Sequence, residues 1–168
     1  MIHVCSLSRL HATVEKTGAR HIVTLLGVED RLERPACVPK TNHLFLRMHD
    51  ISMPAEGFVA PEADHVENLI QFVQGWDRAA PMVVHCWAGI SRSTAAAFVS
   101  VCALRPERDE RDIAWAIRHA SPTATPNIRI VMLADAVLGR QGRMVAAVEA
   151  IGRGSFAEEG VPFRLALA

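Results

Sequence analysis

Residues 84–98 read VHCWAGISRSTAAAF, and the rest of the chain is organised around this stretch. An apolar run, MVV at residues 82–84, leads into His85 and Cys86. Gly89 and Arg92 follow, and a pattern of small residues typical of a helix begins at Ser93. The stretch therefore predicts a buried strand, a tight loop and the start of a helix.

Such a loop favours an anion. The first turn of a helix leaves backbone N–H groups without partners, and the helix dipole adds partial positive charge at that end. Gly89 permits a positive φ at low cost, so successive N–H groups can point inward. The planar guanidinium of Arg92 can hold two oxygens of one phosphate. We therefore expect a phosphate-sized anion to bind here.

Cys86 supplies a nucleophile at the base of the loop. A helix N-terminus and a nearby guanidinium favour the thiolate form of a cysteine. Ser93 could donate a hydrogen bond to the sulfur, and His85 could fix the loop through bonds to its backbone. Taken singly, Cys86 reads equally well as a small buried hydrophobic residue, and Arg92 as a solvated surface residue. Their spacing around Gly89 favours the functional interpretation.

The stretch resembles the signature His-Cys-x5-Arg-Ser/Thr of the cysteine-dependent protein tyrosine phosphatases, most closely their dual-specificity branch. The matching residues are His85, Cys86, Gly89, Ser91, Arg92 and Ser93. The resemblance covers roughly residues 22–138, and it implies catalytic roles for Cys86, Arg92 and Ser93 and a supporting role for His85. It also implies a phosphate-binding loop, here named the signature loop (residues 87–92), made of Trp87, Ala88, Gly89, Ile90, Ser91 and Arg92.

The resemblance implies a general acid upstream of the signature. Asp50 matches its place, because it lies 36 positions before Cys86 and opens a loop after a predicted strand. Asp30 and Asp64 are the alternatives. Asp64 is better explained by favourable charge at a helix start, and Asp30 follows an earlier strand. A loop aspartate is also commonly a simple turn former.

Asn127 lies in the segment ASPTATPNIRI, residues 120–130, which resembles the segment after the signature helices of these phosphatases. The resemblance implies a supporting role, with Asn127 tying backbone near the site. Capping of the next helix explains the residue equally well.

The departures from the family pattern bear on the substrate. The chain contains no tyrosine, so it lacks the aromatic wall of deep phosphotyrosine-specific pockets. A shallower cleft would admit phosphoserine and phosphothreonine as well as phosphotyrosine. The variable positions Trp87, Ala88 and Ile90 include no lysine, which disfavours polyphosphoinositides. Trp87 either stacks on a substrate ring or packs against a neighbouring helix.

Composition sets further bounds. The 168 residues are half apolar and carry 18 basic and 18 acidic side chains, so we expect one domain with no general attraction to nucleic acid or membranes. Four cysteines without CxxC spacing predict neither a metal site nor a disulfide framework, and no cofactor is expected. The first 16 residues do not resemble a secretory signal. These features indicate a cytoplasmic protein, and the arginine and alanine content indicates a GC-rich, bacterial genome.

Apolar runs and turn signals predict a single α/β domain, and the resemblance implies that it is of the phosphatase type. Its mostly parallel central sheet should hold about four to five strands flanked by helices. The expected strands are residues 2–5, 21–26, 43–49 and 82–86. The expected helices are residues 8–16, capped by Ser6 or Ser8, and residues 61–76, 93–104, 109–120, 128–138 and 142–151. We expect residues 1–152 to form the catalytic domain and residues 153–168 to form a tail, mobile or docked.

The sequence thus predicts a metal-independent phosphomonoester hydrolase that acts through a phosphocysteine intermediate. Its substrate would be a phosphorylated protein, on phosphotyrosine first and phosphoserine or phosphothreonine as well, or a small phosphoester. A phosphate-binding module without turnover and a rhodanese-like sulfurtransferase are the alternatives, because both also use an anion-binding loop.

Overall fold

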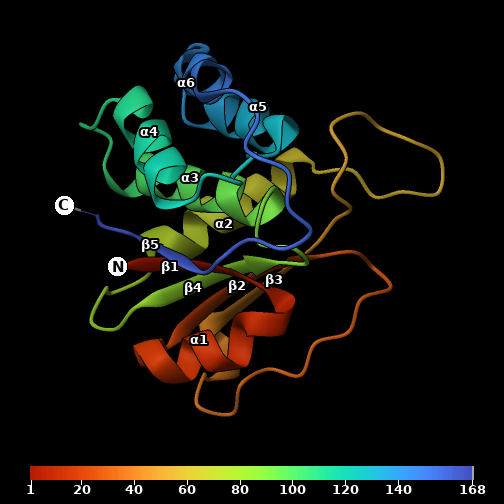
Figure 1. Ribbon diagram of the computed structural model, residues 1–168, viewed down its shortest axis with the longest axis vertical. Coiled ribbons are helices and arrows are strands. Elements are labelled where there is room, and N and C mark those ends of the chain that lie inside the picture. The colour runs from red at the N-terminus through yellow and green to blue at the C-terminus, as the bar shows by residue number, and fades with distance from the viewer. Residues whose placement is uncertain (168) are drawn as a thin grey trace.

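The computed structural model describes residues 1–167, which fold around one five-stranded sheet (Figure 1). The strand order is β3-β2-β4-β1-β5; the first four strands run parallel, and β5 runs antiparallel to β1. The strands are β1 (Ile2–Ser6), β2 (His21–Leu26), β3 (His43–Arg47), β4 (Met82–Cys86) and β5 (Phe163–Leu165). The predicted single-domain α/β fold with a mostly parallel sheet is confirmed.

Six α-helices cover the two faces of the sheet. Figure 1 shows α1 alone on one face and α2 to α6 gathered on the other. The helices are α1 (Leu10–Thr17), α2 (Ala63–Gln74), α3 (Arg92–Leu104), α4 (Glu110–Ala120), α5 (Ile128–Val137) and α6 (Arg143–Ile151). Two short 3-10 segments, η1 (Leu7–Arg9) and η2 (Lys40–Asn42), precede α1 and β3.

Both faces of the central strands are buried, which explains their nearly continuous apolar sequences. Successive side chains of β4 point to opposite faces. Met82 and Val84 join the large core beneath α2 to α6, whereas Val83 joins the smaller core beneath α1. Cys86 lies two residues after Val84, so its side chain points to the same face of the sheet, the one that α3 covers.

The predicted cap of the first helix is wrong. The chain forms η1 after β1, and α1 begins only at Leu10, with Arg9 at its N-cap and no side-chain cap bond. The Ser6 and Ser8 hydroxyls instead donate to the carboxylate of Glu159, far away in the sequence. Local sequence favoured a cap, but a long-range acceptor takes both hydroxyls.

Residues after 152 pass beside the signature loop and then add β5 to the edge of the sheet. The Gly160 N–H donates to Ala88 O in that loop (2.8 Å), and the Gly154 N–H donates to Thr125 Oγ1 (3.1 Å). The sequence predicted no strand in this segment. At three residues, β5 is too short to show an alternating pattern.

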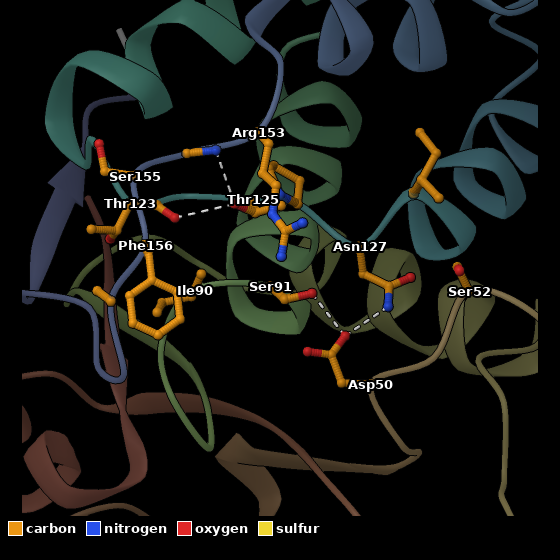
Figure 2. A pocket seen from close by; sticks show the side chains of 14 residues that line it. Asp50, Ser52, Ile90, Ser91, Thr123, Thr125, Asn127, Arg153, Ser155 and Phe156 are labelled. Atoms are coloured by element: carbon orange, nitrogen blue, oxygen red, sulfur yellow. Dashed lines mark hydrogen bonds between the residues drawn. The ribbon is translucent and has the colours of Figure 1, made fainter.

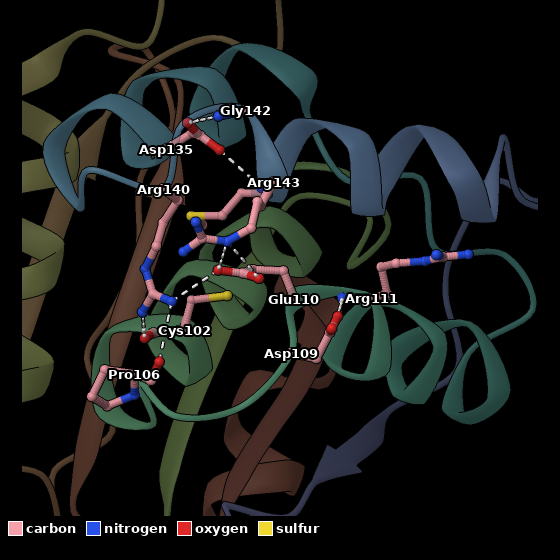
Figure 3. A network of polar contacts seen from close by, with 10 residues as sticks. Cys102, Pro106, Asp109, Glu110, Arg111, Asp135, Arg140, Gly142 and Arg143 are labelled. Carbon is pink, nitrogen blue, oxygen red and sulfur yellow. Dashed lines mark hydrogen bonds and ion pairs between the residues drawn. The ribbon is translucent and has the colours of Figure 1, made fainter.

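A buried ionic network joins the outer helices (Figure 3). Arg140 Nη1 donates to Glu110 Oε1 at 2.8 Å, and Arg143 Nε lies 3.3 Å from both carboxylate oxygens. Only 4% of Glu110 and 7% of Arg140 is exposed. Arg140 also donates to Cys102 O, which ties the network to α3. A buried charge is tolerated when it is paired in this way.

Among residues 1–167, no helix is both long enough and apolar enough to cross a membrane.

Candidate active site

The signature loop joins the carboxyl end of β4 to the first residue of α3, and its carbonyl groups are turned outward. Donors from three distant segments hold them there. The bonds run from the Leu7 N–H to Trp87 O (3.1 Å), from the Gly160 N–H to Ala88 O (2.8 Å) and from the Thr125 N–H to Ile90 O (2.9 Å). Within residues 1–167 the N–H groups of Ala88 and Ile90 have no acceptor. The loop thus presents free donors, as an anion-binding nest does.

Gly89 makes this curvature feasible. Its φ is +73°, which side chains other than glycine rarely adopt. A Cβ at this position would lie 2.8 Å from the backbone of Cys5 and Ser6 in β1. The position therefore requires glycine for its conformation and for the close approach of β1.

Cys86 lies at the base of the loop with 2% of its surface exposed. Its Sγ accepts the Gly89 N–H at 3.3 Å and lies 3.1 Å from Ser93 Oγ. A thiolate at this position would accept both hydrogen bonds. The structure therefore brings Cys86 and Ser93 together as the sequence predicted.

Arg92 occupies the first turn of α3, and its guanidinium is turned toward the end of β3. Its Nη1 donates to Met48 O at 2.7 Å, a contact that the sequence did not reveal. Its Nε is buried and, among the described residues, has no hydrogen-bond partner. A buried donor without an acceptor costs on the order of 1–3 kcal/mol. A bound anion would remove that cost.

Asp50 lies beside the loop and is held by two donors (Figure 2). Its Oδ1 accepts from Ser91 Oγ at 2.7 Å and from Asn127 Nδ2 at 2.8 Å. Figure 2 shows the other oxygen, Oδ2, directed away from both donors. This arrangement leaves Oδ2 free to exchange a proton with a ligand.

Asn127 combines the two roles that sequence reasoning offered as alternatives. Its Oδ1 accepts the N–H groups of Arg129 and Ile130 at 3.1 Å each, which caps α5. Its Nδ2 contacts Asp50. One amide thus fixes the start of a helix and the orientation of a carboxyl group.

His85 begins a buried chain of hydrogen bonds. Its Nε2 lies 2.7 Å from Thr24 Oγ1, which in turn lies 2.8 Å from Nε2 of His43. Burial lowers the pKa of His85 to about 3 and that of His43 to about 4, so both rings are neutral at pH 7. His85 is therefore a fixed structural link behind Cys86.

Asp30 and Asp64, the alternatives to Asp50 as the general acid, are placed elsewhere. The Asp30 carboxylate accepts the Gly27 N–H at 2.8 Å and closes the turn after β2, and Asp64 lies in the first turn of α2.

Trp87 is 60% exposed, which argues against packing on a helix. Burial raises the pKa of Cys102 to about 12, so it is a core thiol.

A cavity of about 820 Å³ opens beside the signature loop (Figure 2). Asp50 and two signature-loop residues, Ile90 and Ser91, line it, and it extends toward residues 153–157. Cys86 and Arg92 do not line it. Among residues 1–167, no group of three or more His, Cys, Asp or Glu side chains is arranged to hold a metal ion.

Comparison with known proteins identifies the family. The family model for protein-tyrosine phosphatase matches residues 21–122, more than half of the chain. The chain belongs to the protein-tyrosine phosphatase family. No curated protein sequence matches.

Solved structures of dual-specificity-like members share the fold of this phosphatase-family chain. DUSP15 is 18% identical with a TM-score of 0.66, and the match covers 94% of each chain. The human tyrosine phosphatase-like serine/threonine/tyrosine-interacting protein is 18% identical with a TM-score of 0.65, and the match covers 83% of this chain and 92% of that one. A mouse putative dual specificity phosphatase complexed with zinc tungstate is 15% identical with a TM-score of 0.59, covering 87% and 84%. The chain therefore has the fold and family of the cysteine-based phosphatases.

Proposed function

We propose that the protein hydrolyses phosphomonoesters through a phosphocysteine intermediate on Cys86, without a metal. Its substrates would be phosphorylated proteins, with phosphotyrosine preferred and phosphoserine or phosphothreonine accepted. The family assignment supports a cysteine-based phosphatase. The intermediate, the residue roles and the substrate class are our inference from the geometry.

The observation that carries the proposal is the buried Arg92 Nε, which has no acceptor among residues 1–167, beside a loop whose N–H groups are free within the same residues. These donors suit the equatorial oxygens of a phosphoryl group, whose negative charge the transition state spreads over three atoms. The mouse relative solved with zinc tungstate was crystallised with an oxyanion salt, which agrees with this interpretation.

In the first displacement, the Cys86 thiolate attacks phosphorus in line with the departing oxygen. The S–P bond forms as the P–O bond breaks, and Asp50 Oδ2 gives its proton to the leaving oxygen. Ser91 and Asn127 hold Oδ1, so the proton is carried on the oxygen that faces the ligand.

In the second displacement, water attacks the phosphocysteine. Asp50 takes a proton from the water as the new P–O bond forms and the S–P bond breaks. Ser93 Oγ, 3.1 Å from Sγ, donates a hydrogen bond to the departing thiolate. Inorganic phosphate and the free Cys86 thiolate complete the cycle.

Two alternatives make different predictions. A binding module would retain phosphopeptides without hydrolysing them, and it would have no use for a cysteine such as Cys86 at the base of the loop. A sulfurtransferase would take sulfur from thiosulfate, and it would have no use for an acid such as Asp50.

We also propose a reducing, cytoplasmic location, because Cys5, Cys37, Cys86 and Cys102 are all unpaired.

The catalytic groups lie before residue 152, and we retain the proposal that residues 1–152 form the catalytic part. Residues 153–167 brace the signature loop through Gly160 and extend the sheet. Residue 168, the end of the predicted tail, lies outside the described residues.

The decisive experiment is hydrolysis of p-nitrophenyl phosphate in reducing buffer with a chelator present. Wild type should turn over, Cys86→Ser should not, and Cys37→Ser, which replaces an exposed cysteine, should match wild type. Phosphopeptide binding without turnover would favour the module, and cyanide-dependent sulfur transfer from thiosulfate would favour the sulfurtransferase.

A further inference from the structure

The cavity beside the signature loop contains one cationic side chain, that of Arg153. Figure 2 shows its guanidinium reaching from the C-terminal segment down toward Ser91. Within residues 1–167 this guanidinium has no hydrogen bond and no ion pair. Arg153 is therefore a cation in the cavity, and no described residue supplies a hydrogen-bond or ion-pair partner for it.

The backbone on both sides of Arg153 is fixed. Arg118 Nη2 donates to Gly152 O at 2.7 Å, and the Gly154 N–H donates to Thr125 Oγ1 at 3.1 Å. A Cβ on Gly154 would lie 2.5 Å from the Thr123 carbonyl, so the two backbones are in direct contact. Binding through Arg153 would therefore order a side chain and not a loop, which lowers its entropic cost.

Apart from Arg153 and Asp50, the described side chains that line the cavity are uncharged. Ser91 and Asn127 already hold one oxygen of Asp50. Hydroxyl groups of serine and threonine make up most of the remaining polar lining. Phe156, 92% exposed, supplies an apolar edge opposite Asp50.

The cavity is continuous with the catalytic groups through Asp50, Ile90 and Ser91. A substrate with its phosphoryl group in the signature loop would therefore extend its leaving group into this space. At about 820 Å³ the cavity has room for a neighbouring side chain.

We propose that Arg153 is a specificity residue that binds a second anionic group of the substrate, a carboxylate or a phosphate on a residue next to the scissile phosphoresidue. The substrate class is thus an acidic or multiply phosphorylated peptide. This inference rests on the proposed function and names the substrates that the site prefers.

The test uses phosphotyrosine peptides of one sequence whose residue beside the phosphotyrosine is glutamine, glutamate or phosphoserine, with either flank examined. Tyrosine absorbance follows release of the phosphotyrosine phosphate alone. Wild type should show kcat/KM about three- to fivefold higher for an anionic neighbour than for glutamine, the upper range for an exposed ion pair. The glutamate and phosphoserine peptides distinguish the two anions.

Arg153→Gln should bring this ratio to about one, and Arg153→Lys should keep part of it, because an exposed ion pair depends mainly on charge. Arg111→Gln makes the same change in net charge on an exposed arginine of α4, which Figure 3 shows pointing away from the other labelled residues, and it should leave the ratio unchanged. Hydrolysis of p-nitrophenyl phosphate, which has no second anion, should be unchanged in Arg111→Gln and should remain Cys86-dependent in both Arg153 variants.

A ratio of one in wild type, or a ratio that Arg153→Gln does not change, would refute the role of Arg153 while leaving the phosphatase assignment intact. A lack of Cys86-dependent hydrolysis of p-nitrophenyl phosphate would refute the proposed function and this inference together. The two failures are therefore distinguishable.

Discussion

Replacing Asn127 is the most direct test of how Asp50, the proposed general acid, is positioned. Serine caps helices about as well as asparagine, so Asn127→Ser should preserve the start of α5. Its short side chain cannot reach Asp50, however, and the 2.8 Å bond to Oδ1 is lost. The substitution thus separates a catalytic effect from a structural one.

The size of the effect follows from the contacts of Asp50. A hydrogen bond to a charged group contributes on the order of 1.5–3 kcal/mol. The bond from Ser91 remains and the carboxylate is exposed, which places the loss near the low end. About 1.4 kcal/mol corresponds to a tenfold fall in kcat/KM.

The assay compares two leaving groups. Phenol needs protonation more than p-nitrophenol does, and kcat/KM reports only the steps up to the first displacement. The kcat/KM of Asn127→Ser should therefore fall about tenfold on phenyl phosphate and markedly less on p-nitrophenyl phosphate. The melting temperature should stay close to wild type, whereas Asn127→Ala should also lose the cap, at a cost of about 1 kcal/mol.

A double variant completes the test. If Asn127 acts only through Asp50, adding Asn127→Ser to Asp50→Asn should cause little further loss of kcat/KM. Equal losses on both substrates, or additive losses in the double variant, would refute the positioning role.

Three further perturbations test the fold around the site. Gly89→Ala should lower the free energy of unfolding by more than about 1 kcal/mol and abolish phosphatase activity, because its Cβ would meet β1. The free energy of unfolding should fall as the pH drops from 6.5 toward 4. In the folded protein the pKa values of His85 and His43 are about 3 and about 4, below the unfolded value of about 6.5. Between these pH values the unfolded state therefore binds protons that the folded state excludes. Glu110→Ala should cost about 3–5 kcal/mol in a urea titration, because it leaves Arg140 buried without its carboxylate.

Each of these has a matched control. Gly57 also has a positive φ, but a Cβ at that position would have nothing within 4 Å, so Gly57→Ala isolates backbone strain from the clash. His119→Gln, at an exposed histidine, should leave the pH dependence unchanged. Glu107→Ala, in a surface ion pair, should cost less than about 1 kcal/mol. A control variant that lowers the free energy of unfolding as much as its test variant, or a His119→Gln variant that changes the pH dependence, would contradict the proposed cause.

The sequence predicted the features of the site that are local in the chain. The contacts among Cys86, Gly89 and Ser93 span eight residues, so a strand, a turn and a helix start suffice to bring them together. Asp50 was found only through the resemblance to the phosphatases, since its spacing from Cys86 carries no physical signal.

Contacts between distant segments were not predictable from local pattern. Nothing in the sequence links Arg92 to the carbonyl of Met48, because any residue at that register would offer the same acceptor. Thr24 is a polar residue inside the apolar run HIVTLL, and its contact with His85 depends on the β2–β4 register.

The bracing of the signature loop by Gly160 also has a consequence for biosynthesis. A ribosome makes the loop roughly seventy residues before the N–H group that holds Ala88 O. A nascent chain that ends before this contact has all its proposed catalytic side chains but lacks one of the donors that turn the loop carbonyls outward. The mature shape of the site is therefore set late in synthesis, and a protease that cuts residues 153–160 would release that restraint without removing any proposed catalytic group.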